Sequence, residues 1–228
     1  MKFFKKTVTS VSLSAIALMG ASSAVNATVV LDFEGVGNHA NINDFYNGGT
    51  DSLGNSGTDY GIEFSEDTLG CIDADAPGGT CNFANEPTES TAMFFLNANN
   101  SILNMAAGFD TGFSFFYTSS RAASVNVYDG LNGTGNLLAS LDLSVNWQDN
   151  SCSGDPAGMF CNWDAIGVEF AGTAYSIDFG GTANQAAFDD ITFGSATAGG
   201  VPVPEPATLT LLGLGLAGIG FSRRKTKA

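Results

Sequence analysis

Ala165-Ile-Gly-Val-Glu-Phe170 and, after a short break, Ala174-Tyr-Ser-Ile-Asp-Phe179 show the clearest alternation of apolar and polar residues in the chain. In both segments large apolar side chains alternate with polar or small ones, which is the period of a strand with one buried face. No stretch between positions 28 and 200 shows a convincing helical period. The sequence therefore predicts β-strands here, and helices nowhere in this region.

Similar strand-like runs occupy the rest of this region, and turn residues separate them. They are 28–34, 59–65, 91–96, 111–117, 123–128, 137–143 and 187–193. Asn132-Gly133 indicates a hairpin between two of them, because both residues tolerate positive φ. Short strands in a chain with 29 glycines predict an all-β fold, most simply a jelly-roll-like β-sandwich. No internal repeat of 20–50 residues points to a solenoid or a propeller.

The N-terminal end has the pattern of a secretory signal peptide. Lys2, Lys5 and Lys6 precede an apolar run over 8–19, and Val25-Asn26-Ala27 forms a small-x-small cleavage site. We expect residues 1–27 to be removed and residues 28–200 to form one exported domain, long enough to bury a core.

The C-terminal end, 201–228, contains three features in order. Pro204-Glu205-Pro206 forms a stiff stalk, because proline fixes φ and has no backbone donor. The apolar run 207–221 is 15 residues long, short of the roughly 20 that cross a bilayer comfortably. The basic residues Arg223, Arg224 and Lys225 would stay on the cytoplasmic side. The pattern indicates a sorting signal or a plain membrane anchor.

This tail resembles the PEP-CTERM sorting signal of Gram-negative bacteria. The matching residues are Pro204-Glu205-Pro206, the Gly/Leu-rich run 209–221 and Arg223-Arg224-Lys225. The resemblance implies recognition by an exosortase, a membrane enzyme that cleaves near Pro-Glu-Pro. It also implies a short transmembrane helix that inserts residues 207–221 into the inner membrane, and an association with exopolysaccharide at the cell surface or in the extracellular matrix. The alternative is a protein held by a plain anchor.

Charge is distributed very unevenly along the chain. Of eight basic residues only Arg121 lies between 28 and 200, whereas 22 of the 23 acidic residues lie there, giving this region a formal charge of −21. Such a surface repels phosphate backbones, which argues against nucleic-acid binding. It also repels anionic headgroups, so membrane attachment should use the tail. The acidity serves solubility, or some of the carboxylates bind a divalent cation.

The four cysteines form two close pairs, Cys71 with Cys81 and Cys152 with Cys161. Four cysteines allow three connectivities, and the short Gly/Pro-containing loops favour these two local pairings. In an oxidising compartment we expect disulfides. A zinc site is the alternative, but the spacings differ from those of metal knuckles.

Three further segments carry a second resemblance. They are Leu31-Asp32-Phe33-Glu34-Gly35, Val127-Tyr-Asp-Gly130 and Phe188-Asp189-Asp190-Ile191-Thr192-Phe193. They resemble segments of carbohydrate-binding jelly rolls and of the jelly-roll domains of PEP-CTERM proteins. This resemblance implies that the first and last strands are neighbours and that their acidic residues hold a structural Ca²⁺ ion.

Asp189, Glu34 and Asp32 are the calcium ligands that this resemblance predicts. Asp189 alternates with Ile191 and Phe193, so it should face the core, and a buried carboxylate needs a cation or hydrogen bonds. The alternative is that Asp189 only accepts hydrogen bonds from backbone donors.

Trp147 and Trp163 flank the second cysteine pair and stand beside amide and carboxylate side chains. Their aromatic faces would stack on sugar rings; alternatively, both tryptophans pack beneath the cross-linked loop.

The sequence argues against an enzyme. It has one histidine, His39, in a polar stretch, where a solvated loop residue is the default. It has no Gly-x-Ser-x-Gly elbow, no His-Glu-x-x-His and no phosphate loop, and no pair of carboxylates is singled out for glycoside hydrolysis. The sequence thus predicts a secreted surface or matrix protein that associates with exopolysaccharide. The alternative is a structural surface protein without a specific ligand.

Overall fold

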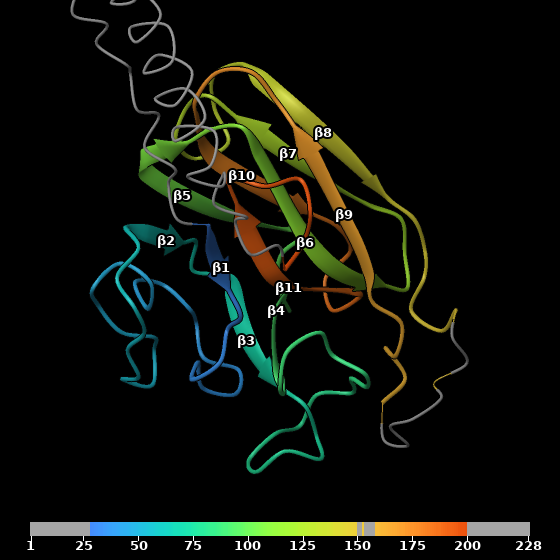
Figure 1. Cartoon of the computed structure of the whole chain (residues 1–228). Helices are drawn as coiled ribbons and strands as arrows, with labels where there is room; N and C mark the ends of the chain where they lie inside the picture. Colours follow the sequence, from blue (N-terminus) through green and yellow to red (C-terminus); the bar gives the residue numbers. More distant parts are fainter. Residues whose placement is uncertain (1–27, 150–151, 153–157, 200–228) are drawn as a thin grey trace, which may run out of the picture.

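The computed structural model describes residues 28–149, 152 and 158–199, and these residues fold into two antiparallel β-sheets (Figure 1). Their strands are β1 Val29–Leu31, β2 Ile62–Phe64, β3 Thr68–Ile72, β4 Thr91–Phe95, β5 Asn100–Phe109, β6 Gly112–Ser119, β7 Ala123–Tyr128, β8 Leu137–Leu143, β9 Asp164–Glu169, β10 Ala174–Gly180 and β11 Ala186–Phe193. The first sheet has the order β3-β4-β11-β6-β9, with β1 also paired to β11, and the second has the order β2-β5-β10-β7-β8.

The all-β prediction is confirmed, because each predicted strand has its counterpart and the described residues contain no helix. Asn132 and Gly133 have positive φ, 57° and 65°, in the turn of the predicted β7–β8 hairpin. Within the described ranges there is no helix long and apolar enough to cross a membrane. The predicted signal peptide 1–27 and sorting segment 201–228 lie outside the described residues.

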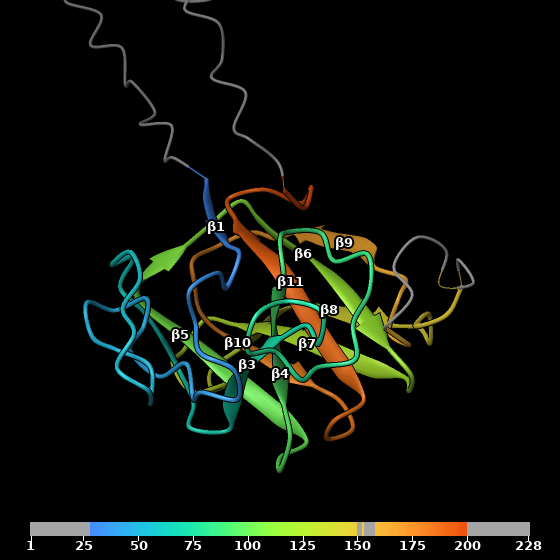
Figure 2. The same ribbon diagram turned by 90° about the horizontal axis from the view of Figure 1, so that it is seen from below.

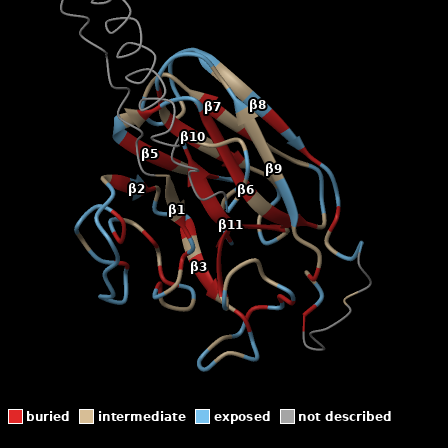
Figure 3. Ribbon diagram, in the orientation of Figure 1, coloured by how far each residue is buried: buried red, intermediate tan, exposed pale blue. Residues whose placement is uncertain are grey.

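Aromatic side chains from both sheets fill the space between them. Phe188 of β11 has its ring centroid 4.9 Å from that of Phe179 of β10 and 5.7 Å from that of Phe115 of β6, and all three side chains are fully buried. Figure 3 shows this burial along the facing strands, with most of the exposed residues in the connections. The inward-facing half of the alternating pattern therefore forms the main core.

The first and last strands are neighbours, as the second resemblance implies. Val29 of β1 pairs with Phe193 at the end of β11, so both ends of the described domain leave from the same side (Figure 2). β11 begins at Ala186, at its other end. The strand therefore connects two opposite ends of the molecule.

Asp51 organises the long β1–β2 connection. Its Oδ1 accepts hydrogen bonds from the backbone N–H groups of Leu53 and Asn55, both at 2.9 Å. Its Oδ2 accepts the backbone N–H of Gly37 and the side-chain amide of Asn55, both at 2.8 Å. Burial alone would raise the pKa of Asp51, but these bonds to the charged form hold the pKa below its usual value.

Asp51→Ala should therefore destabilise the protein by about 3 kcal/mol, because it leaves several donors of this connection without their charged acceptor. Since the pKa is lower in the folded than in the unfolded state, this contribution is present above about pH 4 and is lost as the pH falls through the folded value. Urea unfolding at neutral and acidic pH measures both effects. Asp51→Asn keeps one acceptor oxygen and should lose less. An Asp51→Ala variant as stable as the unaltered protein would contradict this role.

Residues next to two disulfides pack on the outer face of the first sheet. Cys71 of β3 is bonded to Cys81, and Cys152 is bonded to Cys161 in the β8–β9 connection. The Cα atoms are 5.8 and 4.9 Å apart, respectively. These are the two local pairings that the sequence favours. Around the first disulfide lies a second, smaller apolar cluster that includes Phe83, Phe94 and Ala187. Strands β3, β4 and β11 of the first sheet are therefore covered on both faces, by the sandwich core on one side and by this outer cluster on the other, whereas β9 at the edge is partly exposed.

Candidate functional site

A groove of about 690 Å³ lies on the outer face of the first sheet; we call it the outer groove. Phe94 of β4 and Ala187 of β11 contribute to its floor, because both belong to the outer cluster. The other residues come from the covering loops and strand ends. They are His39, Cys71, Thr80, Cys81, Asn82, Phe83, Leu96, Ser120, Arg121, Trp147, Phe160, Asn184, Gln185 and Ala186.

Trp147 is the one tryptophan among the residues that line the outer groove. Its partly buried ring lies against Phe160, with centroids 5.3 Å apart and planes at 56°. The backbone carbonyl of Trp147 accepts the N–H of Cys161 at 2.8 Å, and its own N–H donates to the carbonyl of Ser119 at 3.3 Å. The main chain beneath the ring is therefore fixed both to the disulfide loop and to the end of β6.

Trp163 occupies a different place. Its indole N–H donates to the carbonyl of Ala84 at 3.1 Å, and its ring meets Phe83 edge-to-face at 5.5 Å. It packs against the outer cluster and does not line the groove. The structure thus gives the two predicted sugar-binding tryptophans different surroundings, with only Trp147 in the groove.

Amide side chains provide polar groups along the outer groove. Asn184 is exposed and has positive φ, 56°, in the turn between β10 and β11. Its backbone N–H donates to the carbonyl of Phe95 at 2.8 Å, which fixes the position from which its side chain projects. The hydroxyl of Ser120 donates a hydrogen bond to the side-chain carbonyl of Gln185. The backbone carbonyl of Asn82 accepts the N–H of Phe160 at 3.0 Å. These groups offer both donors and acceptors.

The outer groove also contains the two basic side chains, one Arg and one His, of the described residues. It is lined by Arg121, the one Lys or Arg between residues 28 and 199, and by His39, the one histidine of the chain. None of its lining residues is Asp or Glu. Sequence reasoning did not assign a role to Arg121 and treated His39 as a solvated loop residue. Their scarcity is the signal that could have drawn attention to them.

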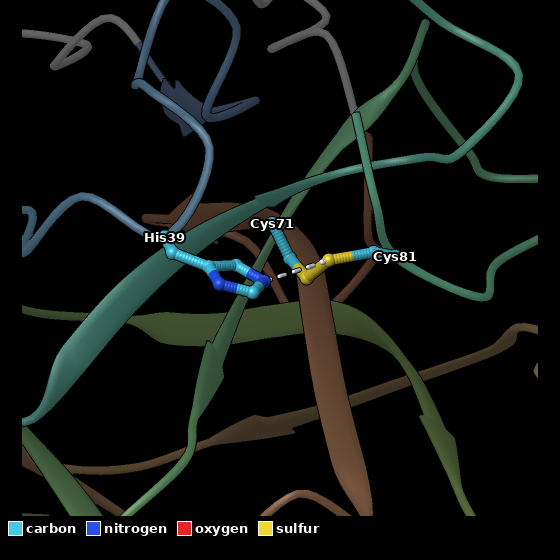
Figure 4. A group of neighbouring side chains, drawn as sticks. All are labelled: His39, Cys71 and Cys81. Carbon is cyan, nitrogen blue, oxygen red and sulfur yellow. Dashed lines mark hydrogen bonds between the residues drawn. A yellow bond between two sulfur atoms is a disulfide. The ribbon is translucent and has the colours of Figure 1, made fainter. Parts of the chain in front are cut away.

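His39 lies beside the first disulfide (Figure 4). Its Nε2 is 3.7 Å from the Sγ of Cys81, and the ligand atoms of His39, Cys71 and Cys81 all lie within 4.8 Å of one another. Zinc needs free thiolates, and these two sulfur atoms are bonded to each other. The cluster is therefore a disulfide with a neighbouring imidazole, and it forms one edge of the outer groove.

A second site candidate is the buried acidic group at the junction of β11 and the β3–β4 loop. Asp189 has no exposed surface. Its Oδ1 accepts the N–H of Asp190 at 2.7 Å, and its Oδ2 accepts the N–H and the hydroxyl of Thr88 at 3.3 and 3.1 Å. The predicted burial of Asp189 is thus observed, and so are the backbone donors named as the alternative to a metal.

The alternation with Ile191 and Phe193 that led to this prediction is broken by a β-bulge. Asp189 pairs with Phe116 and Thr192 with Ser114, so two residues of β11 stand opposite the single Phe115. Asp190 takes a positive φ of 49° there. Asp189 is therefore buried because Thr88 and its loop cover it, and strand alternation does not explain its position.

The surroundings of Asp189 disfavour the charged form of its carboxyl group. Burial, reinforced by the nearby charge of Asp190, raises its pKa to about 9. Burial and then the charge of Asp32 raise the pKa of Asp190. Burial, reinforced by Asp32, also raises the pKa of Tyr46. Several acidic groups thus face one another here without a cationic side chain among the described residues to compensate them.

The other two predicted calcium ligands lie in the same region. Glu34 accepts the N–H groups of Ser90 and Thr91 through Oε1, at 2.9 and 2.8 Å. Asp32 is exposed and accepts the N–H of Glu34 at 3.2 Å. Both Glu34 and Asp189 therefore bind the segment 88–91 directly, each through hydrogen bonds to its own donors.

Several solved structures resemble the described domain at low identity. A family 6 carbohydrate-binding module has 14% identity and a TM-score of 0.35, over 57% of this chain and 82% of that one. The carbohydrate-binding module of Cellvibrio mixtus lichenase 5A, solved with cellotriose, has 12% identity and a TM-score of 0.34, over 57% and 87%. The K3 adhesin domain of Lys-gingipain from Porphyromonas gingivalis has 15% identity and a TM-score of 0.33, over 57% and 91%. No curated protein sequence matches the chain.

The C-terminal segment gives a direct match to a family model. Residues 202–225 match the model of the PEP-CTERM protein-sorting motif. They contain the Pro-Glu-Pro and basic residues on which the sequence resemblance rested. This chain carries a PEP-CTERM sorting motif, the mark of a protein directed to the surface through an exosortase.

Proposed function

We propose that the protein is exported by its signal peptide, processed by an exosortase at its C-terminal segment, and retained at the cell surface or in the extracellular matrix by binding exopolysaccharide. The sorting motif supports the delivery, since an address of this kind specifies where a protein goes. The cleavage of residues 1–27, the membrane helix over 207–221 and the jelly-roll classification belong to the same proposal.

The observation that carries the binding role is the composition of the outer groove. A sugar ring presents an apolar C–H face and a rim of hydroxyl groups. Trp147 and Phe160 offer aromatic surface for the former, while Asn184, Gln185 and Asn82 offer amides for the latter. An open groove of this size accommodates a few sugar units of a long chain.

The position of the outer groove suits a protein attached through its C-terminus. β11 begins at Ala186, which lines the groove, and ends at Phe193, beside β1. At about 3.3 Å per residue, this strand places the groove roughly 20 Å from the end at which the chain continues to the sorting segment. The groove therefore lies at the end of β11 opposite to the one from which the chain continues toward the sorting segment.

Binding without catalysis is the simplest role for this groove. Glycoside hydrolysis uses a pair of carboxyl groups on either side of the scissile bond. The residues that line the outer groove include no Asp or Glu. The amide and aromatic side chains are suited to holding a sugar chain in place.

Trp147→Ala tests this proposal. We expect most of the protein to move from the matrix polysaccharide fraction to the soluble fraction of the native cells, because the aromatic face is lost. Immunoblotting of the separated fractions measures the shift. Tyr60→Ala removes an exposed aromatic ring outside the groove and should leave retention unchanged. Equal retention of the Trp147→Ala variant would favour a structural surface protein without a specific ligand.

A structural Ca²⁺ ion at Asp189, with Glu34 and Asp32, is a second element of the proposal. The supporting observation is a fully buried carboxyl group beside Asp190 and close to Asp32 in a domain with a single Arg and no Lys. A divalent cation would supply the missing positive charge, and carboxylate oxygens are the ligands that Ca²⁺ prefers. Residues of the segment 88–91 would then lose or share their present hydrogen bonds.

A further inference from the structure

The outer groove has a charge opposite to that of the domain around it. Between residues 28 and 200 there are 22 acidic residues and one Arg. The groove is lined by that Arg and by no acidic residue. A groove with the same amide and aromatic side chains but without the Arg would suit a neutral sugar. The placement of Arg121 calls for a ligand with a negative charge.

We propose that the outer groove binds acidic sugar units, of the uronate class, with the carboxylate of the sugar on Arg121 and its ring against Trp147. This inference rests on the proposed polysaccharide binding and specifies the chemistry of the polysaccharide. A guanidinium presents two parallel N–H donors that match the two oxygens of a carboxylate. Such a pair fixes the orientation of the sugar as well as its charge.

Arg121 is held in a position to make this contact. The hydroxyl of Ser119 donates to the backbone carbonyl of Arg121 at 2.6 Å and accepts its N–H at 3.3 Å. Ser120, the preceding residue, donates its N–H to the carbonyl of Gln185 at 2.9 Å. The main chain is thus fixed to the residue before the start of β11, while the Arg121 side chain is exposed. In the described part of the chain no carboxylate forms an ion pair with this guanidinium.

His39 adds a second polar group to the same groove. Its ring packs on Phe94 of the floor, with centroids 5.7 Å apart, and its Nε2 lies 3.4 Å from the hydroxyl of Thr80. Ring and hydroxyl together offer a hydrogen-bonding pair to a sugar hydroxyl or carboxylate. The one Arg and the one His of this domain, 82 positions apart, thus converge on one surface because the topology brings their loops together.

The overall negative charge of the domain is compatible with this ligand. At physiological ionic strength the screening length is about 8 Å, so a carboxylate in the groove interacts mainly with nearby groups. The adjoining hollow, which shares His39 and Leu96 with the groove, is lined by Glu66 and Asp67. These acidic residues repel a carboxylate from that end and so favour its placement at Arg121.

Calorimetric titration of the mature protein from its native cells tests the inference with two probes. One is an oligouronate; the other is the same oligosaccharide with its carboxyl groups reduced to alcohols. We expect the oligouronate to bind about tenfold more tightly or better, as one charge-assisted contact implies. Arg121→Gln should abolish the difference, and Arg121→Lys should retain part of it.

The matched control is Thr173→Glu. It changes the net charge by the same one unit as Arg121→Gln, but it lies in the β9–β10 turn, outside the groove. Its preference for the oligouronate should equal that of the unaltered protein. Equal affinity for both probes, or an unchanged preference in Arg121→Gln, would overturn the inference while leaving polysaccharide binding intact. Failure of the unaltered protein to be retained by its own matrix polysaccharide would instead overturn the proposed function.

Discussion

Asp189→Asn is expected to stabilise the protein at neutral pH when divalent cations are removed. The carboxyl of Asp189 is fully buried, and its pKa is raised to about 9, first by burial and then by the charge of Asp190. In the unfolded chain the same group ionises near pH 4. Folding at pH 7 therefore has to keep a proton on Asp189 that the unfolded chain has released. Asparagine has nearly the same shape and no charge to lose. It keeps one of the two acceptor oxygens, so the loss of a hydrogen bond offsets part of this gain.

The sign of the pH dependence follows from proton uptake. Between about pH 4 and pH 9 the folded protein binds more protons at Asp189 than the unfolded chain does, so stability falls as the pH rises. The slope for one group approaches about 1.4 kcal/mol per pH unit, which amounts to about 4 kcal/mol between pH 4 and pH 7. Asp51, with its lowered pKa, has the opposite dependence, and its contribution is lost only in acid. Asp190, Asp32 and Tyr46 face the same region and share its negative potential.

Urea unfolding at pH 5, 7 and 9, with a chelator, measures this prediction. The unaltered protein should lose stability across the series and Asp189→Asn should lose much less. Added Ca²⁺ should raise the stability of the unaltered protein at pH 7 and leave Asp189→Asn unchanged if the proposed calcium site exists. Asp142→Asn is the matched control, because it removes one exposed carboxylate from β8 in the other sheet and should leave both the pH series and the effect of Ca²⁺ as in the unaltered protein. An Asp189→Asn variant that is several kcal/mol less stable at pH 7 in the chelator would contradict a neutral Asp189.

Replacement of Pro204-Glu205-Pro206 by three alanines should abolish surface delivery. These residues lie in the matched sorting motif, and an exosortase that reads them would no longer recognise the chain. The exported precursor should then accumulate in the inner membrane with its C-terminal segment intact. Cell fractionation and intact-mass spectrometry measure location and processing together.

Lys227→Ala is the control for this experiment, because it changes the C-terminal tail outside the matched residues 202–225. Its delivery and mass change should be those of the unaltered protein. Normal surface delivery of the triple-alanine variant would show that Pro-Glu-Pro is not read, and would favour the plain membrane anchor considered from the sequence.

The alternation of apolar and polar residues predicted most strands but missed β3 and β5, and each omission has a physical reason. β3, Thr-Leu-Gly-Cys-Ile, lies in the part of the first sheet that is covered on both faces. Its sequence therefore does not alternate between apolar and polar residues. β5 is rich in small and polar residues, and its register with β10 shifts beyond Asn104. The bulge at Asp190 is equally invisible in the pattern, which is why the burial of Asp189 was predicted for the wrong reason.

The outer groove could be predicted only in part. Trp147 was recognised because an aromatic residue beside amides near a cysteine is a visible local signal. Arg121, His39 and Asn184 come from loops far apart in the sequence, and only the pairing of β3, β4, β11 and β6 brings them to one surface. Composition did hold a clue, since a single Arg among 22 acidic residues is unusual. The residues that share the groove with Arg121 could be identified only from the structure.

Oxidative footprinting of the mature protein, with and without the polysaccharide of its own matrix, shows directly whether the outer groove is the surface that binds glycan. Glycan binding in the outer groove predicts that Trp147, Phe160 and His39 become protected while the exposed ring of Tyr60 reacts as before. Unchanged reactivity of these three residues, with protection elsewhere on the sandwich, would contradict the account.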